Sequence, residues 1–373
     1  MTQEDKYISL DQISSFETSK VYVNDINLKQ YISTENMVSN LGGITVATNK
    51  PEKGKITQFL EEDILISNIR PYLKKIWFAN EKGGCSSDIL VLRPNDKINS
   101  KYLYYLLSSD KFFNYMMTTS KGTKMPRGDK NAIKKFKIPL VPIIEQNTWV
   151  NLLSQIDKKL ILMQKKHKNK VIFKNEFFNN YVSKLQNNDC NKFKLDKFIT
   201  IHNKRNKNND NIPVLSINNK LGFISQEEQF EDRNVASSDT KNYKIVEKGD
   251  FAYNPARINV GSIARLTNFD KGIISPMYIV FKTDSTIINS VFFENYIFTN
   301  YFKLEILKRL EGSVRLILSA DSLKNIEISV PNLNEQQKIG EFLELLSKDI
   351  YLSEINLIKL KEFKKGLLQK MFV

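Results

Sequence analysis

The sequence has little of the chemistry from which metal centres and redox sites are built. It contains two cysteines and two histidines in 373 residues. Cys85, Cys190, His167 and His202 share no metal-ligand spacing, so the sequence excludes a disulfide framework and a zinc knuckle. Two histidines also provide no Ser-His-Asp or Cys-His arrangement for nucleophilic catalysis. We expect all four residues to be structural, with no metal site and no catalytic residue in this chain.

Cofactor-binding loops and long apolar runs are missing as well. No GxGxxG occurs, and GTKMPRGDK (122–130) fails as a Walker loop because its glycines are too far apart and Asp129 follows the second. NPAR (254–257) is similar to the NPPY-type motif of amino-methyltransferases but lacks the aromatic residue that stacks on a flipped base, so we interpret it as a turn. No apolar run of about 18 residues could span a bilayer. The N-terminus has no signal-peptide pattern, and we expect a cytoplasmic protein without membrane contact.

Positive charge is what the sequence has in excess. Lys plus Arg number 56 against 41 Asp plus Glu, a formal net charge of +15, and the isoelectric point is near 9.4. At 373 residues the chain is long enough to fold into two or three domains. With 41% hydrophobic and 11% aromatic residues, it has the composition of a folded protein. Such a basic, folded chain favours an acidic partner, most often nucleic acid. A basic housekeeping enzyme or a ribosome-associated protein remains the alternative at this point.

An internal repeat covers nearly the whole chain. IPLVPIIEQ (138–146) returns as ISVPNLNEQ (328–336), at an offset of 190 that then holds to the end of the sequence. Upstream, SSDILVLRP (86–94) is similar to ISPMYIVFK (274–282), and DILISNIRP (63–71) to DFAYNPARI (250–258). In the second pair we match Asn68 and Arg70 with Asn254 and Arg257. The chain therefore contains two copies of one unit.

A long amphipathic helix is predicted after each copy of the repeated phrase. Apolar residues there recur at alternating steps of four and three, which is the stripe of a helix that faces another helix. On the central helix they are Trp149, Leu153, Ile156 and Leu160, and on the C-terminal helix Ile339, Leu343, Leu346, Ile350 and Leu357. At His167 the step is four plus four, a stutter. We expect the two helices to bury their stripes against each other; alternatively, each stripe lies on its own globular domain.

Each helix is preceded by a module of mixed α and β structure. Short β-branched runs bounded by Gly, Pro, Asn or Asp predict strands, whereas 101–117 and 290–310 have apolar residues at helical spacing. The predicted domains are 1–140 and 191–328 for the two modules, with helical regions at 141–190 and 329–373.

The chain resembles the specificity subunit of type I restriction-modification systems in a set of motifs and in their order. The marks are YISTENMVSNLGGI (31–44), SSDILVLRP, the Gly-Thr or Gly-Ser step before each repeated phrase, and two trailing helices that end in FKKGLLQKMF (363–372). Each motif alone is weak, whereas their repetition in the same order is specific. The resemblance covers the full length of the chain.

The resemblance implies both a fold and a function. It implies an α+β chain in which two pseudo-symmetric mixed α/β target-recognition domains are joined and separated by two long antiparallel coiled-coil helices. Each domain would read one half of an asymmetric, bipartite site on double-stranded DNA. Methyltransferase subunits, two in number, and restriction subunits would bind this chain, in part through the helix stripes. This chain would bind no cofactor, while the partners would use S-adenosylmethionine and ATP with Mg²⁺.

Candidate DNA-binding residues lie in the loops between strands and around the Gly-Thr or Gly-Ser steps. Arg can read guanine and Asn adenine by two hydrogen bonds, while Lys more often binds phosphate. The candidates are Asn68, Arg70, Lys74, Lys121, Thr123, Lys124, Arg127, Asn254, Arg257, Arg265, Ser313 and Arg315. Two other functions remain open: the recognition module of a fused adenine methyltransferase, and a DNA-binding scaffold or anti-restriction decoy of the same fold.

Overall fold

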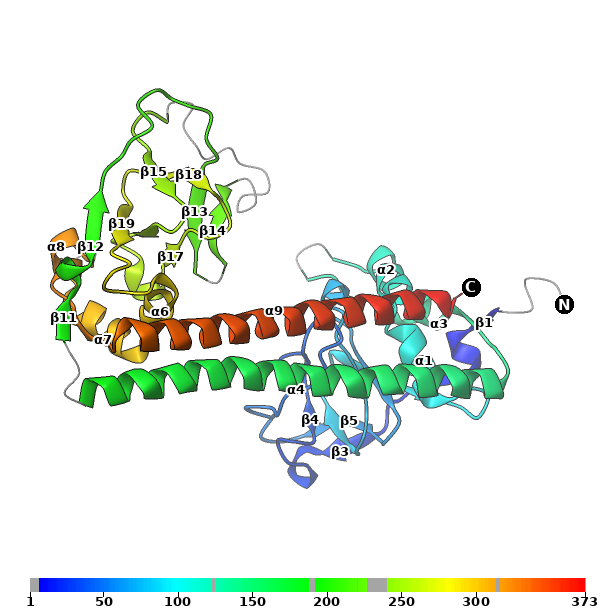
Figure 1. The fold of residues 1–373 in the computed structure, drawn as a ribbon. Helices are drawn as coiled ribbons and strands as arrows, with labels where there is room; N and C mark the ends of the chain where they lie inside the picture. Colours follow the sequence, from blue (N-terminus) through cyan, green and yellow to red (C-terminus); the bar gives the residue numbers. More distant parts are fainter. Residues whose placement is uncertain are drawn as a thin grey trace. The chain divides into compact units, whose positions relative to one another are not determined.

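The computed structural model describes residues 7–122, 125–187, 192–219, 221–226, 240–312 and 316–372. The chain divides into two compact units, which are residues 1–164 with 355–373 and residues 165–354. We call them unit 1 and unit 2. Each contains strands, short helices and segments of both long helices, α4 (Ile143–Asn187) and α9 (Leu333–Lys370) (Figure 1). None of the described helices is long and apolar enough to cross a membrane.

Unit 1 is built around two four-stranded sheets. One sheet has the order β2-β9-β6-β7, the other β3-β5-β8-β4, and β1 pairs with β10. The strands are β1 (Tyr7–Ser9), β2 (Ser14–Phe16), β3 (Lys20–Tyr22), β4 (Tyr31–Ile32), β5 (Lys55–Phe59), β6 (Ile64–Ser67), β7 (Ile76–Phe78), β8 (Gly83–Cys85), β9 (Ile89–Pro94) and β10 (Lys137–Pro139). The helices α1 (Ser100–Leu107), α2 (Asp110–Thr118) and α3 (Lys130–Lys134) contribute buried side chains to the core that contains the first sheet.

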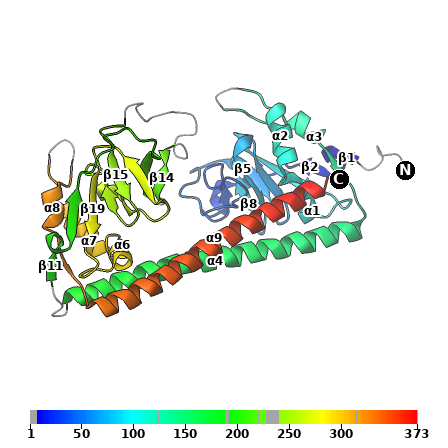
Figure 2. The same cartoon turned by 45° about the horizontal axis from the view of Figure 1, so that its top comes forward.

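Unit 2 repeats the first of these sheets. Its sheet has the order β12-β19-β16-β17, and three further pairs are β11-β20, β13-β14 and β15-β18. Figure 2 labels β11, β14, β15 and β19 of this unit. The strands are β11 (Lys192–Lys194), β12 (Ile199–His202), β13 (Leu215–Asn218), β14 (Gly222–Ser225), β15 (Lys244–Glu247), β16 (Phe251–Tyr253), β17 (Ile263–Arg265), β18 (Lys271–Ile274), β19 (Ile279–Thr283) and β20 (Glu327–Ser329). The helices are α6 (Ser290–Tyr296), α7 (Asn300–Lys308) and α8 (Ala320–Lys324).

The repeated phrase forms the start of each long helix, and its glutamine is a buried hydrogen-bonding residue. In unit 1 Gln146 Oε1 accepts from Asn99 N at 2.8 Å and Nε2 donates to Val141 O at 2.8 Å. In unit 2 Gln336 accepts from Asn289 N at 2.8 Å and donates to Pro331 O at 2.9 Å. Asn99 and Asn289 are the N-caps of α1 and α6. The glutamine thus fixes each long helix to the recognition module, because it supplies hydrogen-bond partners to backbone groups of half-buried residues.

Within each unit the α4 and α9 segments pair in opposite directions. In unit 1 Lys364 Nζ binds Asp157 Oδ1 at 2.5 Å. In unit 2 His167 Nδ1 lies 2.7 Å from Ser353 Oγ, and Lys174 Nζ donates to Ser347 Oγ at 2.6 Å. His167 at the stutter is therefore a hydrogen-bonding residue of the seam. Burial lowers the pKa of Lys174 from its usual value of 10.5.

The apolar stripes are shared between the helix pair and the modules. Leu153, Ile156, Leu160 and Leu357 lie in one core with α1 and α2, and Trp149 packs against it. Leu343 lies in the core of unit 2, with Ile339 packed against it, whereas Leu346 and Ile350 are half-buried. The helices thus pair, and the stripe also covers each module. The predicted fold class of two repeated α/β modules with two long helices is confirmed.

Candidate nucleic-acid interface

One exposed candidate of unit 1 lies at a 3-10 turn that follows strand β6. This turn, η4 (Pro71–Leu73), connects β6 to β7, and Arg70 is its N-cap. Arg70 is exposed, and its guanidinium makes no hydrogen bond or ion pair with any residue that the structure describes. Only its backbone is held, because Arg70 N donates to Pro126 O at 2.9 Å. Arg70 is thus a positioned but unpaired cation.

Three other basic candidates of unit 1 have acidic partners. Lys74 Nζ lies 2.5 Å from Asp110, Lys121 Nζ 2.9 Å from Asp129, and Arg127 Nη2 3.0 Å from Asp88. Hydrogen bonds from Lys74 and from Lys365 of α9 lower the pKa of the Asp110 carboxyl. The side chains of Lys121 and Arg127 are 82% and 57% exposed, so these are weak surface pairs that a phosphate could replace.

Asn68 occupies a tight contact between two loops. Gly128 N donates to Asn68 O at 3.0 Å, and a Cβ at Gly128 would lie 2.9 Å from Asn68 Oδ1. Asn68 Oδ1 is buried without a hydrogen-bond partner in the described chain. The glycine is therefore required for the close approach, and Asn68 is half-buried rather than displayed.

In unit 2 the equivalent turn is η6 (Ile258–Val260), with Arg257 as its N-cap. Arg257 is exposed and, like Arg70, has no side-chain partner among the described residues. NPAR is a turn, as predicted: Arg257 N donates to Asn254 O at 3.0 Å, and Asn254 Oδ1 accepts from Ala256 N at 3.1 Å. Asn254 is 8% exposed, so its amide is used within the fold.

The sheet register corrects one predicted correspondence. Ile64 pairs with Phe78 in unit 1, and Phe251 pairs with Arg265 in unit 2, so the strands align at an offset of 187. Arg70 then matches Arg257, but Asn68 matches Pro255 and not Asn254. Hydrogen bonds agree, because Gly128 N donates to Asn68 O where Leu318 N donates to Pro255 O.

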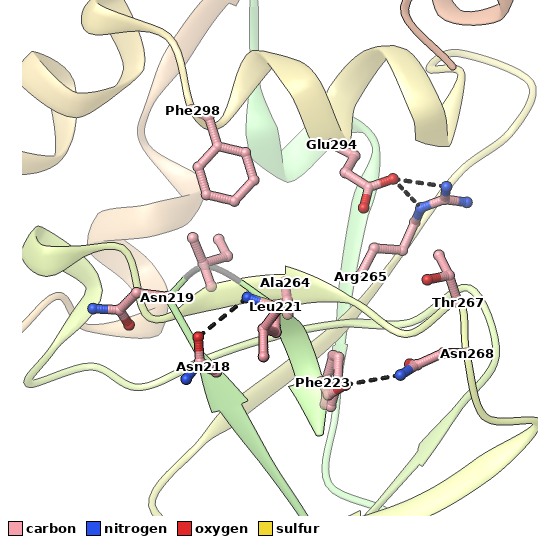
Figure 3. Close-up of a pocket in the computed structure, with 12 residues that line it drawn as sticks. Asn218, Asn219, Leu221, Phe223, Ala264, Arg265, Thr267, Asn268, Glu294 and Phe298 are labelled. Carbon is pink, nitrogen blue, oxygen red and sulfur yellow. Dashed lines mark hydrogen bonds and ion pairs between the residues drawn. The ribbon is translucent and has the colours of Figure 1, made fainter. Parts of the chain in front are cut away.

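Arg265 points toward helix α6 rather than along the turn. Its guanidinium holds Glu294 through Nη2 at 2.7 Å and Nε at 2.8 Å, and the arginine side chain is 18% exposed. Figure 3 shows this pair at the wall of a pocket of about 220 Å³, with Phe298 on the α6 side. The β13-β14 hairpin forms the opposite wall through Asn218 and Phe223.

The remaining candidates are Thr123, Lys124, Ser313 and Arg315, which lie outside the described residues. Sequence reasoning did not identify the acidic partners Asp88, Asp110 and Glu294. No local signal marks them, because each lies in a segment distant from the base that it binds. The structure thus places an exposed arginine, without a side-chain partner among the described residues, at the same turn in each unit.

Comparison with known proteins identifies the relatives of this chain. The type I restriction modification DNA specificity domain matches residues 10–174 and again 187–362. The specificity subunit of the type I restriction enzyme MjaVIII from Methanocaldococcus jannaschii is 26% identical over 322 residues, covering 79% of this chain and 72% of that protein. The MjaIX specificity subunit from the same organism is 23% identical over 310 residues, covering 74% and 69%.

Solved structures share the fold. The S subunit of a type I restriction-modification system from M. genitalium has a TM-score of 0.63 at 16% identity, covering 98% of this chain and 96% of that one. A chain from a study of complex assembly and conformational transition in the type I system has a TM-score of 0.56 at 15% identity, covering 98% and 97%. Since the two domain matches span most of its length, this chain belongs to the family of the type I restriction modification DNA specificity domain.

Proposed function

We propose that this chain is the sequence-specific DNA-binding specificity subunit of a type I restriction-modification complex. Each unit's recognition module reads one half of a bipartite DNA target, and the chain directs methyltransferase and restriction subunits to that target. The duplicated fold and the family membership support two readers in one chain. The modules differ in sequence, so the two half-sites differ and the target is asymmetric.

The observation that carries this proposal is the recurrence of one unpaired arginine at one turn. Arg70 and Arg257 are both N-caps of a 3-10 turn, which follows β6 in unit 1 and β16 in unit 2. Both are exposed without a side-chain partner in the described chain. An arginine can bind O6 and N7 of guanine in the major groove by two hydrogen bonds. The net charge of +15 supplies the sequence-independent attraction to phosphate.

Partner subunits have an apolar surface to bind on the long helices. In unit 1 Ile161 and Leu162 are 64% and 67% exposed, and in unit 2 Leu345 and Tyr351 are 67% and 62% exposed. Large apolar side chains exposed along a helix are typical of an interface with another protein. We propose that one methyltransferase subunit binds each unit here, and that restriction subunits join the complex. S-adenosylmethionine, and ATP with Mg²⁺, would be bound by these partners.

Methylome sequencing of cells that carry single variants tests the proposal. Arg70→Ala is expected to relax or abolish bases in one half of the methylated motif, and Arg257→Ala in the other half, at about 1–3 kcal/mol per lost base contact. Lys97→Ala in unit 1 and Lys324→Ala in unit 2 are controls outside the two turns. They should leave the motif unchanged.

Two results would contradict the proposal. If either arginine variant changes both half-sites, the modules read DNA jointly. If deletion of the whole chain leaves every methylated motif in place, the chain has no role in target choice.

A further inference from the structure

The turn that carries Arg70 or Arg257 also presents a second side chain, and the two units differ there. Aligned by the sheet register, Pro71 matches Ile258, Tyr72 matches Asn259, and Leu73 matches Val260. The first residue of each turn is buried and anchors it. The middle residue of each turn is exposed, with Tyr72 at 51%.

In unit 1 this turn is held by backbone bonds from a separate loop. Leu73 O accepts from Asn40 N at 2.8 Å, and Lys74 O accepts from Leu41 N at 3.0 Å. Arg70 and Lys74 have φ values of 50° and 49°, the left-handed region that non-glycine residues avoid. Strain of this kind persists only where the surroundings determine the conformation, and it gathers at functional sites.

In unit 2 the equivalent carbonyl oxygen accepts its hydrogen bond from a different part of the fold. Val260 O accepts from Asn219 Nδ2 at 2.7 Å, at the tip of the β13-β14 hairpin. The C-cap is Gly261, with a φ of 93°, where unit 1 has Lys74. Different parts of the chain therefore hold a 3-10 turn with a left-handed C-cap in each unit, although Arg70 is left-handed and Arg257, with a φ of -136°, is not.

The side chains at the middle position differ in the chemistry that distinguishes bases. Neither Tyr72 nor Asn259 makes a side-chain hydrogen bond to any described residue, so both are available. Asparagine can bind N6 and N7 of adenine by two hydrogen bonds, whereas an aromatic ring makes an apolar contact with the thymine methyl group. Each lies two residues after an unpaired arginine on a rigid turn.

We infer that Tyr72 and Asn259 determine base preference, each in its own half-site: Asn259 selects adenine, and Tyr72 selects thymine through its methyl group. This inference rests on the proposed function and adds residues to it. Arg70 and Arg257 supply the same guanine-directed contact in both modules, and the middle residue makes the two half-sites differ.

The test is methylome sequencing of the complete complex with exchanged residues, Tyr72→Asn and Asn259→Tyr. Each exchange should lower the preference for one base of one half-site by about 5- to 150-fold and leave the other half-site unchanged. Tyr72→Phe retains the ring and should keep the original motif. Tyr22→Asn is the matched control, because Tyr22 is similarly exposed, at 56%, in the same unit.

Each outcome of this experiment either supports or overturns the inference. An unchanged motif in both exchanged variants overturns the inference while leaving the proposed function intact if Arg70→Ala still alters its half-site. Loss of the preferred base from one half-site by Tyr72→Asn supports the inference if Tyr72→Phe keeps the motif and the Tyr72→Asn variant melts at the original temperature. The same loss by Tyr72→Phe, or a lowered melting temperature in Tyr72→Asn, shows that Tyr72 stabilises the turn and overturns it.

Discussion

Units 1 and 2 have different residue pairs at one contact between the core sheet and a helix. In unit 1 the last residue of β7, Phe78, lies against Tyr104 of α1, with ring centroids 5.6 Å apart. In unit 2 the aligned residues are Arg265 and Glu294, which form an ion pair. Phe78 and Arg265 pair in the same register with the neighbouring strand, β6 in unit 1 and β16 in unit 2. The repeated scaffold therefore accepts either an aromatic pair or an ion pair at this contact.

At the start of each long helix, both units keep the residues that hydrogen-bond to the backbone. The N-caps Asn99 and Asn289 and the buried Gln146 and Gln336 make equivalent hydrogen bonds in the two units. A surface loop keeps its backbone β-bridge as well, but its side chains differ: the bridge joins Lys121 and Arg127 in unit 1, and Glu311 and Ile317 in unit 2. One scaffold can thus display two different surfaces to DNA.

The largest effect is expected from a charge placed in either core. Leu153 and Leu343 are both 0% exposed, in the cores of unit 1 and unit 2 respectively. Leu153→Asp or Leu343→Asp should lower the free energy of unfolding by about 4 kcal/mol or more, because an unpaired carboxylate is buried. Thermal melting followed by circular dichroism measures this, and each variant should destabilise its own unit.

Exposed leucine and isoleucine on the same helices are the matched controls. Ile161→Asp and Leu345→Asp should leave the melting temperature within a few degrees but reduce co-purification of methyltransferase subunits. If the buried and exposed variants melt alike, the helices do not pack on the modules as described. If the exposed variants retain their partners, these surfaces are not the docking sites.

A smaller effect is expected from the glutamine that both units share. Gln146→Leu leaves Asn99 N and Val141 O without partners, and Gln336→Leu leaves Asn289 N, Pro331 O and Ile287 O. The cost should be about 2–4 kcal/mol, larger for Gln336, because each partly buried backbone group that loses its partner keeps a desolvation penalty.

The adjacent exposed residues provide the comparison. Asn147→Leu and Gln337→Leu remove only exposed hydrogen bonds, including one to the same N-cap asparagine, which water can replace, and should change stability by less than about 0.5 kcal/mol. Chemical denaturation of all four variants measures the difference. Equal effects from buried and exposed positions would show that the hydrogen bonds of the repeated phrase do not hold the helix start.

Sequence reasoning reached the fold because the signals for it are local or repeated. The helical stripe, the turn at NPAR and the repeated phrase each depend on residues close together in the chain, and the structure has the expected elements there. Matching Asn68 with Asn254 was wrong by one position. That match followed the shared residue type, although the paired segments 63–71 and 250–258 already have the offset of 187 that the strand register gives.

The candidate site was harder to predict than the fold, because availability depends on distant partners. Arg70 and Arg127 are both plausible DNA contacts by type and position. Only the structure shows that Asp88 binds Arg127 while Arg70 has no partner among the described residues. Tyr72 was not a candidate either, since a tyrosine in a short turn has no sequence signature that distinguishes it from a buried one.

The smallest effect is expected when the chemistry of unit 1 is transferred to unit 2. Arg265→Phe or Glu294→Tyr alone leaves one charge partly buried without its partner and should cost about 1–2 kcal/mol. The double variant recreates the aromatic pair of unit 1, worth about 0.5–1.5 kcal/mol, and should recover most of that loss. A double-mutant cycle by chemical denaturation measures the coupling between the two positions. Additive losses would show that this position is not interchangeable between the units. Methylome sequencing of the same double variant then separates the two roles of Arg265: a retained motif with recovered stability assigns the arginine to the scaffold, and a base lost from one half-site assigns it to DNA.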